Sequence, residues 1–162
     1  MRPIRAEPGE RRTVGGIGAA AGLLRGLDQG AVDVIGSDHA PHTLVEKAAT
    51  YPASPSGMPV VQTLLPIMLD HAAAGRLSLL RLMDLTSVGP ARLFGISGKG
   101  CIAVGNRGDF TLVDSAAKWR ILDQEMANQS GRTLFHDSEV TGCPMATIIR
   151  GLVAMREGDL AA

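Results

Sequence analysis

The fold is decided by residues 31–42, which read AVDVIGSDHAPH. The first half of this stretch is short, β-branched and mostly apolar, which is typical of a buried strand. Polar, titratable side chains follow at once, namely Asp38, His39 and His42. In α/β barrels the active site lies at the C-terminal ends of the strands. The stretch therefore predicts a strand of a parallel sheet with functional side chains at its end.

The residues on both sides of this stretch predict an α/β unit. Before it, residues 19–27 read AAAGLLRGL and indicate a helix. After it, residues 43–58 are rich in proline and small polar residues, and a loop of this length in a compact domain is often functional. Further helices are expected at residues 59–74 with a late start or a kink at Pro66, at 79–85 behind the N-cap Ser78, and at 90–94 behind Pro90.

The character of the chain changes after Gly98. Short β-type runs separated by Gly, Asn, Asp and Ser occur at residues 101–104, 110–113, 119–122, 146–149 and 152–155. We therefore predict an α/β unit over residues 1–97 and a small β unit over residues 98–162. Trp119, the only tryptophan, is expected to pack inside the β unit.

Composition places the protein among globular proteins. Hydrophobic residues make up 45% of the chain, and 16 basic residues balance 16 acidic ones. This balance argues against nucleic-acid binding, which needs a clustered basic excess. The longest apolar segment, residues 59–69, is shorter than the ~20 residues that cross a bilayer. Cys101 and Cys143 have no C-x-x-C spacing and are expected to be free thiols in a reducing cytoplasm.

The polar cluster at the end of the predicted strand contains one carboxylate and two imidazoles within five residues. Aspartate and histidine serve as metal ligands and as proton-transfer groups. Pro41 stiffens the segment between the two histidines. A simpler interpretation also fits these residues alone, in which Asp38 caps a turn and the histidines are solvated.

The longer pattern resembles the metal-dependent dihydroorotases of the amidohydrolase superfamily. The matching stretches occur in order over nearly the whole chain: residues 32–43 with Glu46 and Lys47, residues 56–59, 62–66, 75–78, 85–87 and 89–95, and then Lys99, Gly100, Asp109, Arg150 and Gly151. The resemblance implies a fold of class α/β, with residues 1–97 as the last part of a metal-dependent (β/α)8 TIM barrel and residues 98–162 as part of a small β-sandwich. It also implies residues 32–37 as the last barrel strand.

The activity that the resemblance implies is reversible hydrolysis of dihydroorotate to N-carbamoyl-aspartate in pyrimidine biosynthesis, with one or two zinc ions. Asp38 corresponds to the family residue that binds the metal and moves the proton during catalysis. His42 corresponds to a histidine that contacts the carboxylate of the substrate, and Ser56 and Gly57 to loop positions that contact the substrate. His39 is expected to pack or to support a metal ligand rather than to bind metal itself, and Glu46 and Lys47 are expected to form a solvated pair.

Other parts of the family pattern are missing from the sequence. A complete barrel takes about 250 residues, and no H-x-H pair of metal ligands occurs here. Catalytic zinc needs three protein ligands. An asparagine of the family that contacts substrate is also absent, since Met1-Arg2-Pro3 stands in its place. We therefore expect a truncated dihydroorotase that is inactive alone and that, because its apolar faces are uncovered, aggregates, oligomerises or is partly molten.

Two alternatives remain open. The chain is compatible with a non-catalytic dihydroorotase-like subunit that docks on another enzyme of the pyrimidine pathway or forms a homo-oligomer. It is also compatible with an allantoinase or hydantoinase, which share the barrel and the aspartate. The loop after the aspartate in those enzymes usually differs from residues 40–43, which read APHT.

Overall fold

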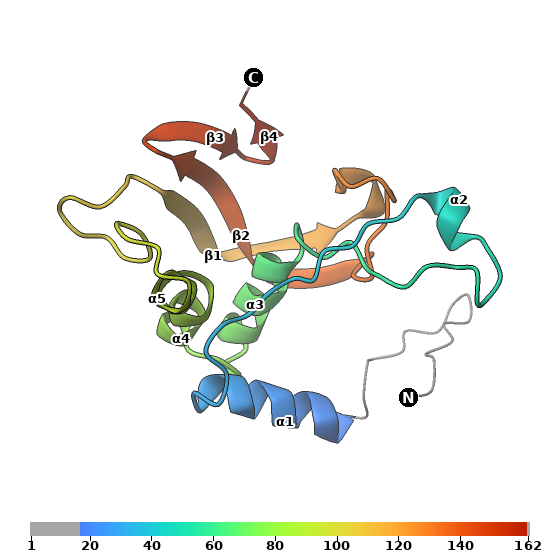
Figure 1. Ribbon diagram of the computed structural model, residues 1–162, viewed down its shortest axis with the longest axis horizontal. Helices are drawn as coiled ribbons and strands as arrows, with labels where there is room; N and C mark the ends of the chain where they lie inside the picture. Colours follow the sequence, from blue (N-terminus) through green and yellow to red (C-terminus); the bar gives the residue numbers. More distant parts are fainter. Residues whose placement is uncertain (1–16, 162) are drawn as a thin grey trace.

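A computed structural model describes residues 17–161 of the protein (Figure 1). Its elements are α1 (Ile17–Asp28), α2 (Leu44–Lys47), α3 (Leu64–Ala73), α4 (Leu79–Met83), η1 (Asp84–Val88), α5 (Gly89–Leu93), β1 (Phe110–Ile121), η2 (Asp123–Glu125), β2 (Ser138–Ile149), β3 (Leu152–Arg156) and β4 (Asp159–Leu160). The strands form an antiparallel sheet in the order β1-β2-β3-β4. The α-helices therefore precede the sheet, in agreement with the order of elements expected from the sequence.

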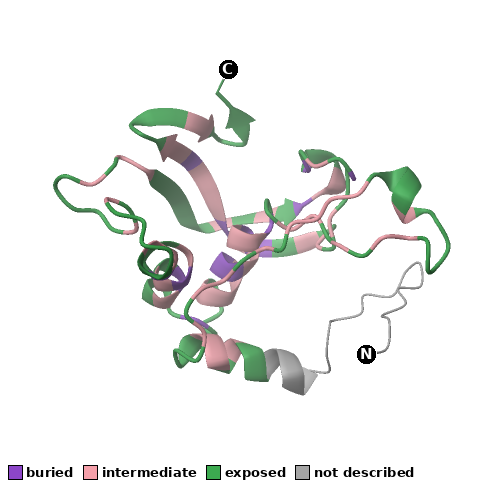
Figure 2. Cartoon of the chain, viewed as in Figure 1, coloured by how far each residue is buried: buried purple, intermediate pink, exposed green. Residues whose placement is uncertain are grey.

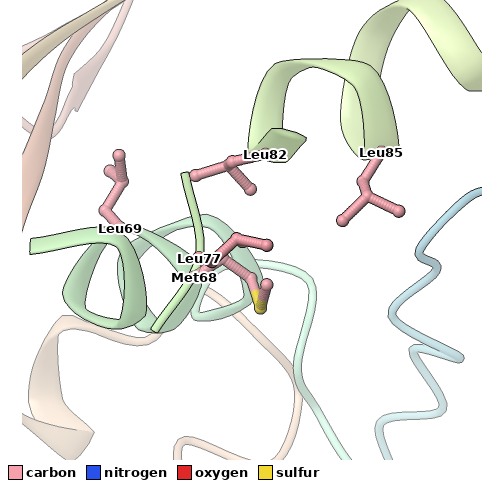
Figure 3. Close-up of a cluster of buried hydrophobic side chains, with 5 residues drawn as sticks. All are labelled: Met68, Leu69, Leu77, Leu82 and Leu85. Carbon is pink, nitrogen blue, oxygen red and sulfur yellow. The ribbon is translucent and has the colours of Figure 1, made fainter. Parts of the chain in front are cut away.

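The helical part is built around a cluster of buried side chains. Figure 3 shows its five members gathered between α3, the turn after it and the helix formed by α4 and η1: Met68, Leu69, Leu77, Leu82 and Leu85. Leu27, Val32 and Ile35 pack against this cluster from the α1 side. Burial of a leucine side chain contributes ~1.5–3 kcal/mol, so this cluster fixes α1 and the segment after it to the other helices.

The helix boundaries follow the predicted signals. Pro66 lies in the first turn of α3, where its missing N–H breaks no helical hydrogen bond, and the helix begins later than the apolar pattern. The Ser78 side chain accepts a hydrogen bond from the Arg81 N–H at 3.1 Å and caps α4. Pro90 lies at the start of α5, as expected. The π-helical turn η1 between α4 and α5 was not predicted.

Residues 32–37 form no strand, contrary to the sequence prediction. The segment is held by the helices, since the Ile35 N–H donates to the Leu85 carbonyl at 3.2 Å. Gly89 permits this approach, because a Cβ there would lie 2.5 Å from the Asp33 carbonyl oxygen. A strand forms only where a neighbouring strand accepts and donates its hydrogen bonds, and the described residues provide none beside this segment.

Arg81 adds a polar connection that sequence reasoning missed. Its guanidinium donates to the carbonyl of Leu27 at 2.7 Å, to the carbonyl of Val32 and to the carboxylate of Asp84. The side chain therefore joins the end of α1 and the start of the following segment to α4. An arginine has five donors in a fixed fork, which suits it to connecting three acceptors in this way.

The sheet has its own smaller core. Ile121, Met126 and Val140 are buried, and Trp119 packs against them while its indole N–H donates to the Gly142 carbonyl at 3.0 Å. The predicted packing role of Trp119 is therefore confirmed. The predicted runs at 110–113 and 119–122 belong to the single strand β1, which contains irregular pairing between Asp114 and Lys118. Residues 101–104 form no strand, contrary to prediction.

The sheet attaches to the helices through α3. The Thr141 N–H on β2 donates to the Asp70 carboxylate at 3.1 Å. Gly142 has φ +103°, and a Cβ added there would lie 2.6 Å from the Leu69 Cβ. Because only glycine permits this approach, β2 packs directly on the surface of α3.

Much of the apolar surface is exposed. Figure 2 shows the buried residues concentrated around α3 and the nearby part of the sheet, whereas most of β1 is exposed. Leu80 is 79% exposed and Ile102 is 84% exposed, and Leu112 on the edge strand β1 is also exposed. Uncovered apolar surface and a free strand edge favour association. They support the expectation that the chain self-associates, which stays a prediction.

Two further expectations concern the thiols and the membrane. Cys101 is exposed and Cys143 is half-buried, and both are free, as predicted. Burial raises the pKa of the Cys143 thiol, which keeps it protonated at neutral pH. Among the described helices, none has the length and apolar character needed to cross a bilayer.

Candidate active site

Asp38 lies at the end of the extended segment that follows α1. Its backbone adopts φ +46°, in the left-handed region that non-glycine residues rarely enter and that aspartate tolerates better than most. The residue is exposed, and its carboxylate makes no hydrogen bond or ion pair with any described residue. Backbone conformations of this kind concentrate at functional sites. The geometry thus leaves an exposed carboxylate, without a partner among residues 17–161, at the point where the segment ends.

The chain after Asp38 is paired with residues near Met58. His39 and Met58 form an isolated parallel bridge, and the Ala40 N–H donates to the Met58 carbonyl at 3.0 Å. The His39 Nδ1 accepts a hydrogen bond from the Val61 N–H at 3.2 Å. This bond ties one ring nitrogen of His39 to the backbone of the loop, which agrees with a packing or supporting role. Residues 38–61 therefore form a loop whose two ends lie together.

Gly57, in the later part of this loop, lies close to Ala40 in its first part. It has φ +124°, and a Cβ there would lie 2.8 Å from both the Cβ and the carbonyl oxygen of Ala40. The same Cβ position is 3.4 Å from the His42 Cδ2, so Gly57 and His42 are neighbours in space. Ser56 beside it is exposed. The loop thus brings the candidate substrate contact Gly57, with Ser56 beside it, next to the candidate His42, which lies well before them in the sequence.

A capping box organises the start of the loop. The Thr43 hydroxyl caps the short helix α2, while its N–H and hydroxyl donate to the Glu46 carboxylate at 2.8 and 2.9 Å. These hydrogen bonds from Thr43, the backbone one first, hold the pKa of the Glu46 carboxyl below its usual value. The Glu46 Oε2 is also 3.8 Å from the His42 Nδ1. Glu46 therefore pairs with its own helix cap and lies beside His42.

The predicted solvated pair of Glu46 and Lys47 is wrong. The Lys47 ammonium instead donates to the carbonyls of Pro55 and Gly57, at 2.8 and 2.7 Å. The reason is geometric: successive residues of a helix point in different directions, so Lys47 turns toward the returning limb of the loop while Glu46 turns to the helix cap.

Gln62 anchors the end of the loop to the sheet unit, a contact that sequence reasoning missed. Its Nε2 donates to the Glu125 carbonyl at 2.8 Å, and its Oε1 accepts from the Ala127 N–H at 3.0 Å. An amide side chain bonded in this way imitates a backbone pair. No local pattern indicates these bonds, because the two partners lie more than 60 residues further along the chain.

The donor set of the described residues does not match the metal that the resemblance implies. Catalytic zinc takes three protein ligands from His, Cys, Asp or Glu. Over residues 17–161, no three side chains of these types are grouped closely enough to hold a metal ion. Asp38 is available, but His39 is bonded to Val61 and His42 lies beside Glu46. The residues described here therefore do not form a zinc site by themselves.

Comparison with known proteins shows the family to which this chain belongs. A family model described as Amidohydrolase family matches residues 18–153. The chain belongs to this family. It is 38% identical over 157 residues to the dihydroorotase of Halobacterium salinarum, which covers 97% of this amidohydrolase chain and 34% of that protein. It is 36% identical over 142 residues to the dihydroorotase of Bacillus subtilis, which covers 86% of the chain and 33% of that protein.

Solved structures of amidohydrolases are also similar to this chain. An L-hydantoinase from Arthrobacter aurescens superimposes with a TM-score of 0.81 at 30% identity, over 86% of this chain and 32% of that one. A dihydropyrimidinase from Brevibacillus agri gives a TM-score of 0.82 at 27% identity, with the same coverage. The amidohydrolase chain thus spans about a third of the length of the proteins it matches. The likeness confirms the expected fold class, one part of an amidohydrolase fold.

Proposed function

We propose that this amidohydrolase chain is the part of a dihydroorotase-type enzyme that supplies the proton-transfer residue Asp38 and one wall of the substrate site. The observation that carries the proposal is the exposed Asp38 carboxylate, which has no partner among the described residues and is held at φ +46° on the loop that also gathers His42 and Gly57. Identity of 36–38% to dihydroorotases over most of the chain supports the same substrate class.

The proposed chemistry assigns each residue one task. Water adds to a ring carbonyl of dihydroorotate, a C–O bond forms and the ring C–N bond breaks, which gives N-carbamoyl-aspartate. The Asp38 carboxylate takes the proton from the water and returns it to the departing nitrogen, so it ends the cycle ionised. The His42 imidazole donates to the carboxylate of the substrate. The backbone at Ser56 and Gly57 lies against the ring, where the absence of a side chain on Gly57 permits a close approach.

The metal is part of this proposal. Zinc supplies, when bound, a polarised carbonyl and a water of lowered pKa. We propose that one or two zinc ions are held by Asp38 together with residues from the remaining two thirds of a family enzyme, because the described residues lack the other ligands. A cytoplasmic location belongs to the same proposal, since both cysteines are free.

The isolated chain of 162 residues is therefore expected to retain less than about 0.1 zinc per chain after gel filtration, because a single carboxylate holds zinc weakly. Atomic absorption on protein prepared with excess zinc measures this ratio. The Asp38→Ala variant provides the background for adventitious binding. One zinc per wild-type chain that is lost in Asp38→Ala would contradict the expectation and would require ligands that the described residues do not group together.

The function itself is tested on the longest open reading frame that contains these residues. Its product, loaded with zinc, is assayed with dihydroorotate, hydantoin and allantoin. We expect kcat/KM for dihydroorotate to exceed the other two values by about 10²-fold or more, because a site built around the substrate carboxylate loses that contact with hydantoin. Equal or greater activity on hydantoin would overturn the proposal in favour of the second candidate, a hydantoinase-type hydrolase, which the solved structures favour.

A third candidate is a non-catalytic subunit that acts through a partner. The exposed apolar residues of β1 and α4 favour it, since they provide surface for a homo-oligomer or for another enzyme of the pathway. A stable complex that forms equally with Asp38→Ala, from a reading frame without hydrolase activity, would support this candidate.

A further inference from the structure

In the loop of residues 38–61, the later part, residues 54–61, is called the returning limb. Among the described residues, Lys47 is the only one whose charged side chain bonds to this limb from the middle of the loop. Its ammonium is half-buried and donates to the carbonyls of Pro55 and Gly57, at 2.8 and 2.7 Å. Its own carbonyl accepts from the Ser54 hydroxyl at 3.4 Å. No described carboxylate lies within ion-pair distance of the ammonium. A solvated lysine has no reason to adopt this position, so the two carbonyls account for it.

The two hydrogen bonds close the loop onto itself. They join residues that are eight and ten positions apart, and the second one ends at Gly57, which lies next to Ala40 and His42. Hydrogen bonds with an ionised donor contribute about twice as much as neutral ones. Apart from them, the returning limb is tied to the rest of the loop by the bonds from Ala40 to Met58, from Val61 to His39, and from Ser54 to Thr50 and Lys47. Those bonds lie at Ser54 or beyond Gly57, so residues 55–57 depend on the lysine.

We propose that Lys47 is a positioning residue for the substrate site: its ammonium locks residues 55–57 against His42 and so sets the orientation of the Ser56–Gly57 backbone. The substrate part of this inference rests on the proposed dihydroorotase function. The hydrogen-bonding chemistry also explains why residue 47 is a lysine. A compact ammonium points separate N–H donors at two carbonyls 2.7–2.8 Å away, whereas methionine of similar length has none.

Hydrogen exchange tests the lock on the 162-residue chain. Exchange is read peptide by peptide and does not require a monomer. In Lys47→Met we expect the amides of residues 48–58 to exchange at least about tenfold faster, because two charge-assisted bonds are lost. Amides of β2 serve as an internal reference, and Lys118→Met is the matched control, since Lys118 is exposed on β1 without a described partner. Lys47→Arg, which keeps the charge and donors, is expected to restore part of the protection.

Kinetics on the active reading-frame product test the substrate role. In Lys47→Met we expect KM for dihydroorotate to rise about tenfold while kcat changes less than about threefold, because ground-state and transition-state contacts of the loop are lost together. Lys118→Met is expected to behave as the wild type. Unchanged exchange in Lys47→Met overturns the proposal, and so does faster exchange with unchanged KM. A wild type without hydrolase activity overturns the proposed function instead. The exchange result still decides whether Lys47 holds residues 55–57 in place.

Discussion

Asp38→Asn is expected to lower kcat/KM for dihydroorotate by about 10²- to 10⁴-fold in the active reading-frame product, because an amide does not accept and return the proton that the carboxylate transfers. Asparagine tolerates the left-handed backbone at φ +46° as aspartate does, so the loop should keep its conformation. The pattern of hydrogen exchange over residues 38–61 is the measurement that separates lost chemistry from a lost fold. It should be unchanged.

Asp33→Asn is the matched control for this substitution. Asp33 lies on the same extended segment and is exposed like Asp38, but it precedes the left-handed turn and its carboxylate has no assigned task. It should retain activity within about threefold, in line with ordinary surface substitutions. If Asp38→Asn also retained activity at that level, proton transfer by Asp38 would be excluded. Asp38→Ala should in addition loosen the loop, because alanine is less tolerant of a positive φ.

The local elements were largely predictable because their causes are local. Ser78 provides a cap, Pro66 and Pro90 lie in first turns, and apolar periodicity marks α3. The candidate residues Asp38 and His42 were found for the same reason, since they form one short cluster. The predicted strand over residues 32–37 failed because a strand is a property of a pair of segments, and the described residues provide no neighbour for it.

The contacts that sequence reasoning missed join residues eight or more positions apart and are made by polar side chains. Gln62 bonds to backbone at the end of η2 and just after it, Arg81 connects α1 to α4, and Lys47 bonds to carbonyls of its own loop. Each residue type is common on protein surfaces, so nothing in the local pattern distinguishes a bonded side chain from a solvated one. The residue Gly57 was a candidate by resemblance only. Its physical requirement, a close approach to Ala40, became visible with the fold.

Gly57→Ala is expected to lower kcat/KM for dihydroorotate by about 10²-fold, through displacement of the loop rather than through lost chemistry. The new Cβ would lie 2.8 Å from two atoms of Ala40, whereas ordinary contacts start at 3.4 Å. The limb must therefore move away from His42, and alanine at φ +124° adds strain of about 1–3 kcal/mol. Exchange of the Ala40 and Val61 amides, whose bonds join the two limbs, should rise in the same variant.

Gly36→Ala is the control that makes this prediction decisive. Gly36 lies two residues before Asp38, has no positive φ, and a Cβ there meets nothing within 4 Å. It adds the same methyl group near the same site without a clash, so activity and exchange should stay close to wild type. Normal activity in Gly57→Ala would mean that the limb carrying Ser56 and Gly57 does not set the substrate position. The wall of the site would then have to be sought outside residues 55–57, and Asp38 would act without the support of this loop.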